Sequence, residues 1–566
     1  MQVRLRISRS PQPLIPSQTL QAQIASDSVP TAVDPPSATK PSNSAGASSQ
    51  VALGILVSRI TGLLRETVIA HFFGNSSVAG VFRAAIRIPN LLGNLFGEGV
   101  LSATFVTVYS KLRAQNENEE AENVAAAIFG VLALVCAALV LVGVLRTPLL
   151  IDFIVPGFQG VDRTLTIHLV RALFPGAGML VMSAWCLGIL NSHRRFLLSY
   201  MAPVAMNITM ITAALLFGPH SSETQLAINL AWASVFGSVL QFTVQLPRVL
   251  KLLPAFRPVL DITSEGVRTV IRNFGPVSLS RGVVQISAYI DQMIASFLGP
   301  IAISTLGYCQ VISMLPISLF SMSVSAAELP ALSSAIGTPD QIAAVLRDRL
   351  AAGLRRIAFF VIPSAVAFLL LGDIIAGALY QTGRFHHADA VYVWSALAGS
   401  AVGLLATSLG RLYSSAFYAL LDTRTPLRFA LIRVLLTATL GYVFALRLPG
   451  WMGIDAIWGV AGLTASAGVA GWVEFALLRH ALAERVGNIA LPPDFILKLW
   501  SVAFLGAGLG YLIKELLSAV HPLFLAILVL PVYGAVYFAG TFFLGIDESR
   551  STLLPILRRL TRRVSR

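Results

Sequence analysis

Long apolar segments recur along the chain from about residue 50 to residue 545, and only short polar stretches separate them. A helix needs about 20 mostly apolar residues to cross a bilayer. Segments of this kind predict about fourteen membrane-spanning helices, with gaps too short to hold a soluble domain. The expected spans are 50–73, 80–110, 124–146, 168–190, 200–218, 227–247, 271–298, 303–333, 353–379, 390–418, 427–446, 456–478, 497–514 and 522–545.

Composition supports the same interpretation. Of the 566 residues, 55% are hydrophobic and 12% are charged, whereas soluble domains carry about 25% charged residues. This excludes a water-soluble enzyme and predicts an all-α polytopic membrane protein. The three cysteines, Cys136, Cys186 and Cys309, stand inside apolar segments without metal-ligand spacing, so we expect them to be small buried hydrophobic residues.

The positive charges are unevenly distributed between the predicted loops. An even number of crossings places both termini on one side, and only five basic residues fall in the loops of the other side: Arg146, Arg163, Arg384, Arg447 and Lys514. Because basic loops stay in the cytoplasm, both termini are predicted to be cytoplasmic. The net charge of +14 then indicates topology, and we expect no nucleic-acid partner.

The two ends of the chain differ from its middle. Residues 1–47 lack an apolar segment and are rich in Pro, Ser, Gln, Ala and Thr, which predicts a disordered cytoplasmic tail. Residues 546–566 form a basic cytoplasmic tail. Between them we expect an N-terminal lobe at 48–249, a C-terminal lobe at 271–480 and two further helices at 495–545.

Landmarks repeat between the two lobes. Ile69-Ala70-His71-Phe72-Phe73-Gly74 ends the first helix, and Ile294-Ala295-Ser296-Phe297-Leu298-Gly299 ends the seventh, 225 positions later. An acid precedes each glycine by eight residues, Glu66 and Asp291. Further matches at nearly the same offset are Pro89 with Pro316 and Pro203 with Pro426. The pattern predicts two parallel six-helix repeats around a central cavity, related by an axis along the membrane normal.

Charged residues inside the spans are the main functional signal, because a charge at the centre of a membrane helix costs about 2.5–3.5 kcal/mol. Arg59 and Glu66 share a face of the first helix, seven residues apart. The charges singled out on this basis are Arg59, Arg65, Glu66, Arg83, Arg87, Glu98, Arg281, Asp291, Glu328 and Arg411. Since guanidinium groups match phosphate oxygens bidentately, the cluster predicts an anionic substrate, with phosphate or pyrophosphate as the natural candidate.

Other interpretations of these charges stay open. The arginines also fit structural ion pairs with Glu66, Glu98 and Asp291, and function and structure are equally favoured for Arg83 and Arg87. Asp291 and Asp422 are candidates for coupling to Na+ or H+, against ion pairing or, for Asp422 before Thr425-Pro426, capping of a helix.

Motifs of enzymes are absent from the sequence. It contains no Walker A motif, no His-Glu-x-x-His and no Gly-x-Ser-x-Gly. We therefore expect neither an enzyme nor a bound cofactor or metal.

Two motifs in the first two helices resemble a known family. Ser58-Arg59-Ile60-Thr61-Gly62-Leu63-Leu64-Arg65-Glu66 precedes Phe73-Gly74, and Arg87-Ile88-Pro89-Asn90-Leu91-Leu92 precedes Phe96-Gly97-Glu98-Gly99. Together they resemble the signature of the MurJ (MviN) family of lipid II flippases, within the multidrug/oligosaccharidyl-lipid/polysaccharide exporter superfamily. Weaker matches, such as Ala202-Pro203 with Asn207, extend the resemblance over about 50–545.

The resemblance implies a fourteen-helix transporter in the bacterial inner membrane. It implies movement of lipid II, the undecaprenyl-pyrophosphate-linked peptidoglycan precursor, to the outer leaflet, with the polyprenyl tail in a groove of the last two helices. Carried over by motif, the family's cavity residues fall on Arg59, Arg65, Glu66, Arg87 and Glu98. The implied partners are lipid II, membrane lipids and proteins of cell-wall synthesis.

This chain also departs from the family pattern. Gly80 replaces an acid, Asn94 replaces a base, and Gln310-Val311 replaces an Asp-Arg pair in the eighth helix. We expect Arg281, one helix earlier, to supply the missing positive charge of the cavity.

Two alternative functions fit the sequence. One is export of another polyprenyl-linked glycan or of a drug, and the other is a non-transporting paralogue that scaffolds cell-wall enzymes. A scaffold should tolerate Arg59→Ala and Arg65→Ala, whereas a flippase should not. The sequence leaves Na+, H+ and the membrane potential alone as candidate driving forces.

Overall fold

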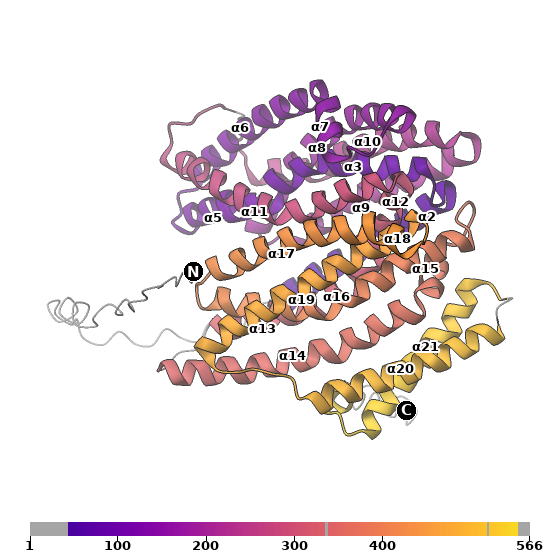
Figure 1. Cartoon of the computed structure of the whole chain (residues 1–566). Coiled ribbons are helices and arrows are strands. Elements are labelled where there is room, and N and C mark those ends of the chain that lie inside the picture. The colour runs from indigo at the N-terminus through magenta and orange to yellow at the C-terminus, as the bar shows by residue number, and fades with distance from the viewer. Residues whose placement is uncertain (1–43, 258, 334–337, 518–519, 553–566) are drawn as a thin grey trace, which may run out of the picture. The chain divides into compact units, whose positions relative to one another are not determined.

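The computed structural model describes residues 44–257, 259–333, 338–517 and 520–552 (Figure 1). The chain divides into two compact units, Met1–Ser49 and Gln50–Arg566. Of the first unit only residues 44–49 are described, so most of the predicted tail at 1–47 lies outside the described residues, as does 553–566 of the predicted basic tail. The rest of this section concerns the second unit.

The described residues form helices and contain no strand, which confirms the predicted all-α class. The helices of the N-terminal half are α2 (Ser44–Phe73), α3 (Ser77–Phe96), α4 (Glu98–Leu101), η1 (Ser102–Val106), α5 (Thr107–Ala114), α6 (Asn118–Leu145), α7 (Thr147–Ile154), α8 (Gly160–Ser192), α9 (Phe196–Phe217), η2 (Gly218–His220) and α10 (Glu223–Leu252).

The C-terminal half continues in the same manner and ends in a helical hairpin. Its helices are α11 (Glu265–Phe297), α12 (Pro300–Pro316), η3 (Ile317–Met322), α13 (Ser323–Ser333), α14 (Pro339–Leu370), α15 (Gly372–Tyr380), α16 (His387–Ala419), α17 (Arg424–Tyr442), η4 (Val443–Arg447), α18 (Leu448–Met452), η5 (Ala456–Trp458), α19 (Gly459–Val486), α20 (Pro493–Leu516) and α21 (Pro522–Phe543).

Twelve helices of the described part are long and apolar enough to cross a membrane, so the chain is a multi-pass membrane protein. Helices α2 and α11 occupy the places of the predicted first and seventh spans but fall outside this set. The physical reason is their polarity, since α2 carries Arg59, Arg65 and Glu66, and α11 carries several charges including Asp291. Hydropathy therefore does not confirm the count of fourteen.

Helix pairing repeats between the two halves. In the first half α8 packs against α3, α6 and α10, and α10 also packs against α9. In the second half α16 packs against α12, α14 and α19, and α19 also packs against α17. The short helices α7 and α15 and the π-helical segments η1 and η3 occupy corresponding places. The same packing scheme appears twice, which confirms the predicted duplication.

The first turn of each half is built in the same way. Gly74 after α2 has φ of 62°, and Gly299 after α11 has φ of 97°, backbone conformations that suit glycine. Ser76 then caps α3 by accepting a hydrogen bond from the Ala79 N–H at 3.2 Å, whereas Pro300 starts α12 at a position that needs no N–H. These turns bring the starts of α3 and α12 together.

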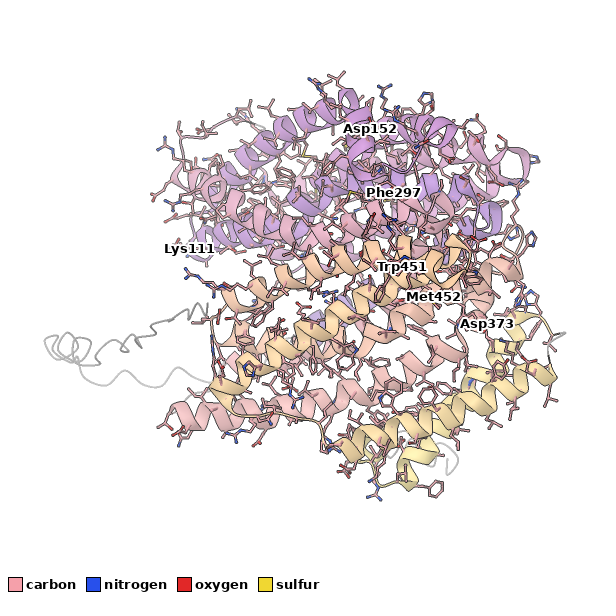
Figure 2. All side chains as sticks on the ribbon, in the orientation of Figure 1. Lys111, Asp152, Phe297, Asp373, Trp451 and Met452 are labelled. Carbon is pink, nitrogen blue, oxygen red and sulfur yellow. The ribbon has the colours of Figure 1, made fainter. Side chains whose placement is uncertain are left out.

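The C-terminal hairpin of α20 and α21 packs on α14 and α15 (Figure 1). Asp373 of α15, labelled in Figure 2, forms an ion pair with Lys514, with its Oδ2 2.6 Å from Lys514 Nζ. The hydroxyls of Tyr533 and Tyr537 donate to the carbonyls of Pro363 and Phe359, at 2.7 and 2.6 Å. Polar contacts therefore hold the hairpin to the second half.

Candidate functional site

Glu66 lies at the centre of a buried ionic cluster near the end of α2. Its Oε1 accepts a hydrogen bond from Arg65 Nη2 at 2.8 Å, and its Oε2 forms an ion pair with Arg83 Nη2 at 2.8 Å. Glu66 is only 8% exposed. One carboxylate thus pairs with two guanidinium groups from two helices, and the three side chains together keep one positive charge. We call Arg65, Glu66 and Arg83 the paired cluster.

Arg65 also reaches into the neighbouring helix α9. Its Nη1 donates to Asn207 Oδ1 at 3.0 Å, and Asn207 Nδ2 donates to Thr61 Oγ1 at 3.1 Å. Asn207 is buried, so this amide fixes the direction of the Arg65 side chain. Asn207 is one of the residues that match the family, but the match assigns it no role. The structure shows that it contacts Arg65.

Arg83 connects the two halves. Its guanidinium lies over the ring of Tyr308 of α12, 4.0 Å from the ring centroid. Gly307 leaves room for this contact, because a Cβ there would lie 2.6 Å from Arg83 Cδ. The sequence identified Arg83 as an intramembrane charge, but we did not include it among the predicted cavity residues. Neither its contact with Tyr308 nor the burial of Glu66 can be deduced from the sequence.

The same ends of the helices close one side of the interface between the halves. A Cβ at Gly80 would overlap the Pro300 carbonyl. Asn75 donates to Thr305 Oγ1 at 2.8 Å and accepts from Ser304, and the Tyr308 hydroxyl donates to the Gly74 carbonyl at 2.8 Å. The sequence places these residues at the outward ends of their helices, so the halves meet tightly at the predicted outer side.

Arg59 does not join the cluster. It lies on the exposed surface of α2, and among the described residues no acid lies within 4 Å of it. The shared helix face that the sequence predicted for Arg59 and Glu66 therefore produces no ion pair, since seven residues along a helix span about 10 Å.

Arg87 points toward the second half. Its guanidinium lies 5.9 Å from the ring centroid of Tyr289, whose hydroxyl donates to the Arg87 carbonyl at 3.2 Å. Arg87 also lies within electrostatic range of Asp291. It lines a cavity of about 320 Å³ with residues of α11, α12, α16, α17 and α19.

The charged residues of this C-terminal cavity are Arg87, Asp291, Arg411 and Arg433. Arg433 Nη1 donates to Glu474 Oε2 at 3.1 Å, and Arg433 is also within electrostatic range of Asp291. Sequence reasoning missed Arg433, although the same signal, a charge inside an apolar span, is present there. It also missed that Arg411 of α16 and Arg433 of α17 meet in one cavity with Arg87.

Two more of the predicted site residues, Glu98 and Arg281, have side chains outside the described part of the structure. Glu98 is the first residue of α4, and Arg281 lies in the middle of α11. The prediction that Arg281 supplies the missing cavity charge therefore stays a prediction. Among the described residues, no group of three His, Cys, Asp or Glu residues is arranged to hold a metal ion.

Asp422 lies between α16 and α17, away from the cavity lining. Its Oδ1 accepts hydrogen bonds from the N–H groups of Arg424 and Thr425, each at 3.0 Å, and its Oδ2 accepts from Thr425 Oγ1 and from Arg485 Nη2, each at 2.7 Å. These hydrogen bonds, those from Thr425 above all, hold the pKa of Asp422 well below its usual range. The contacts are those of a carboxylate that caps α17.

The three cysteines are free and buried, as the sequence predicted. No disulfide constrains the described part of the fold, and its stability depends on packing between helices. One large cluster of buried apolar side chains includes residues of both halves and of the α20–α21 hairpin.

Known proteins resemble this chain over most of its length. The family model described as lipid II flippase MurJ matches residues 69–531. A Burkholderia cenocepacia protein named lipid II flippase MurJ is 32% identical over 464 residues, which cover 80% of this chain and 87% of the relative. A Rhizobium tropici protein named probable lipid II flippase MurJ is 31% identical over 474 residues, 81% of this chain and 85% of the relative.

Solved structures show the same fold. A lipid II flippase MurJ in an inward closed conformation has a TM-score of 0.72 at 23% identity, covering 88% of this chain and 99% of the other. An inward-facing multidrug resistance MATE transporter of the MOP superfamily has a TM-score of 0.59 at 18% identity, covering 78% of this chain and all of the other (100%). With the sequence matches above, these findings show that the chain belongs to the MurJ family of lipid II flippases.

Proposed function

We propose that this protein moves lipid II from the inner to the outer leaflet of the bacterial inner membrane by alternating access, without making or breaking a bond. The observation that carries the proposal is a half-buried set of guanidinium groups, Arg65 and Arg83 with Arg87 nearby, at the boundary between two repeated halves of a MurJ-family chain. Guanidinium groups bind pyrophosphate oxygens in bidentate fashion.

Glu66 gives the paired cluster a way to release its substrate. Leaving a buried cation without a counter-ion is expensive, and Glu66 supplies that counter-ion to both arginines when no substrate is present. A pyrophosphate entering the cavity competes with Glu66 for the same guanidinium groups. Binding thereby exchanges one anion for another, and Glu66 takes the arginines back when the lipid leaves.

Alternating access follows from the duplicated architecture. We assign residues 48–249 and 271–480 to two lobes that rock against each other. Opening toward the outer side requires the contact of Gly80 with Pro300 and the bonds of Asn75 with Ser304 and Thr305 to separate. Helix α11 contacts elements of both halves, so we assign it the role of the hinge.

Three further assignments belong to the proposal. Both termini face the cytoplasm, the α20–α21 hairpin (within residues 495–545) guides the polyprenyl tail, and the exposed Arg59 meets the substrate as it enters. The cycle is driven by Na+ or H+ coupling, or by the membrane potential, which is worth about 2.3 kcal/mol per elementary charge at 100 mV.

The test is depletion and complementation. The full chain is expressed in a bacterium whose own flippase can be switched off, and outer-leaflet lipid II is measured by its accessibility to an externally added cleaving toxin. We expect the wild type and the control Arg428→Ala, an exposed arginine at the start of α17, to restore accessible lipid II. We expect Arg65→Ala to fail with normal membrane insertion.

Other results would favour the alternatives. If the inserted wild-type protein restores neither growth nor accessible lipid II, even with the native lipid supplied, export of another polyprenyl-linked glycan or a drug becomes the better hypothesis. If Arg59→Ala and Arg65→Ala both restore growth as well as the wild type does, a scaffold for cell-wall enzymes fits better than a flippase.

A further inference from the structure

The C-terminal cavity concentrates positive charge from three helices. Arg87 comes from α3, Arg411 from α16 and Arg433 from α17. Arg433 lies close enough to Arg411 to repel its charge. Like charges inside a membrane protein are unfavourable unless anions balance them.

The acids near the cavity do not balance this charge. Asp291 lies within range of Arg87 and Arg433, and Glu474 forms an ion pair with Arg433. Among the described side chains, three cations against these two acids leave one positive charge in excess. The excess is assigned to Arg411, because its guanidinium forms no ion pair and Glu474, the acid within its electrostatic range, pairs with Arg433 at 3.1 Å.

Polar groups at the cavity also lack partners. Gln292 is 2% exposed, and among the described residues neither its Nε2 nor its Oε1 has a hydrogen-bond partner. Asp291 Oδ1 is buried and unpartnered as well. A buried polar group without a partner destabilises the protein unless a ligand satisfies it. Both residues line the cavity, so a ligand there would meet guanidinium and amide donors together with a carboxylate acceptor.

From this arrangement we infer that the C-terminal cavity is a second anion site, which binds a phosphate or carboxylate group of the transported lipid through Arg411, with Arg87 and Gln292 as further donors. Asp291 would accept from a hydroxyl or amide N–H beside that anion. The cavity of about 320 Å³ holds roughly ten waters at about 30 Å³ each, which is enough for one anionic group but not for a disaccharide. The inference rests on the proposed function, because it names the part of that substrate which enters the second half.

The cavity lies at a position where the sequence departs from the family pattern. Gln310 lines the same cavity as Arg411 and Arg433, and Gln310-Val311 is where an Asp-Arg pair is missing by resemblance. Arginines from α16 and α17 therefore bring positive charge to the place where α12 has none. This assigns the missing charge to Arg411 and Arg433, where the sequence alone suggested Arg281.

The test measures binding to the purified full chain in lipid nanodiscs by titration calorimetry. One probe is undecaprenyl pyrophosphate, which carries the phosphates without glycan or peptide. The other is a soluble N-acetylmuramyl peptide, which carries carboxylates without phosphate. We expect Arg411→Gln to weaken the binding of one of the two probes at least tenfold. The probe whose affinity falls identifies the anion that enters the cavity.

Matched variants separate binding from folding. Arg428→Gln removes an exposed arginine from α17 and should leave both affinities unchanged, and Arg411→Lys should restore part of the loss because it keeps the charge. The double variant Arg433→Gln with Glu474→Gln removes Arg433 together with its partner and so leaves no unpaired acid. It should weaken the binding of the same probe. Each variant is compared at an unchanged melting temperature.

Two outcomes would overturn the inference. One is an Arg411→Gln protein that binds both probes as tightly as the wild type does, and the other is a wild type that binds neither probe. The flippase proposal is judged separately by the complementation assay. A protein that restores accessible lipid II, with and without Arg411→Gln, leaves the proposed function standing and removes the second site.

Discussion

The two charged regions of the molecule are built on opposite principles. In the paired cluster, Glu66 touches both Arg65 and Arg83 at 2.8 Å, and Tyr308 covers the second guanidinium. In the C-terminal cavity, the exposed Arg411 forms no ion pair among the described residues, and Gln292 has no hydrogen-bond partner there. Each region keeps one positive charge in excess, but both arginines of the paired cluster touch an acid, whereas Arg411 does not.

The difference shows why the number of buried arginines does not identify a site. A buried cation with an adjacent acid is a structural element until something displaces that acid, because both charges are already compensated. A cation that lines a cavity without such an acid favours any anion that enters. By this criterion the paired cluster must rearrange to bind substrate, and the C-terminal cavity can bind without rearrangement.

The largest effect is expected from Glu66→Gln. This change removes the acid that pairs with Arg65 and Arg83, whose side chains are 26% and 15% exposed, and breaking a buried pair costs at most about 3–5 kcal/mol. We expect loss of complementation and a free energy of unfolding lower by up to that amount, measured by denaturant titration in detergent micelles.

An exposed ion pair provides the control for Glu66→Gln. Asp152 accepts from Arg163 at 2.7 Å, but the side chains are 52% and 37% exposed. Exposed ion pairs contribute little to stability, so Asp152→Asn should change neither stability nor transport measurably. Equal effects of the two substitutions would show that Glu66 is not a buried counter-ion.

Gly80→Val tests whether the paired cluster depends on closure of the outer side. Any Cβ at this position overlaps the Pro300 carbonyl, so α3 must move away from α12 and carry Arg83 away from Tyr308. We expect at least tenfold slower transport, with outer-end distances between spin labels on α3 and α12 shifted to larger values. Gly508→Val is the control, since no atom lies within 4 Å of a Cβ there; matching distances in both variants would contradict the closure.

The fold was largely predictable from the sequence because hydropathy and repetition are local signals. The offset between Gly74 and Gly299 predicted a duplication that the packing of α8 and α16 repeats. The first and seventh helices were also found, although the charges of α2 and α11 keep them below the apolarity of an ordinary membrane span. Local pattern therefore determines the elements and their order.

The site was only partly predictable because its contacts join distant segments. Arg65 and Glu66 are neighbours in the sequence, and their pairing needed no fold. The position of Arg83 over Tyr308 depends on how helices of different repeats approach each other, and that of Arg433 beside Glu474 depends on how α17 packs on α19. No spacing along the chain contains these contacts, although Arg433 itself carries the signal of a charge inside an apolar span.

Substitutions at Tyr308 separate two contributions to the contact between the halves. Tyr308→Phe keeps the ring under Arg83 and loses the hydrogen bond to the Gly74 carbonyl, a loss of about 1 kcal/mol. Tyr308→Leu also loses the cation–π contact, about 2 kcal/mol when it is desolvated. We expect transport to fall less than threefold in the first variant and several-fold more in the second, measured as toxin-accessible lipid II. Equal effects would mean that Arg83 gains nothing from the ring.

The smallest effect is expected at Asp422, an acid whose partners are all present. Asp422→Asn keeps a capping side chain on α17, the helix that carries Arg433, but loses the charge facing Arg485. At neutral pH we expect the free energy of unfolding to fall by about 0.5–1 kcal/mol. Transport should be normal. Because the pKa of Asp422 is lowered in the folded protein, its contribution is present above the unfolded value of about 3.9 and is lost as the pH falls below it. Melting temperatures of wild type and variant in detergent should therefore differ at pH 7 and converge below about pH 4. A gap that widens on acidification would show that the folded carboxyl is protonated first, and Asp422 would then return as a candidate for proton coupling.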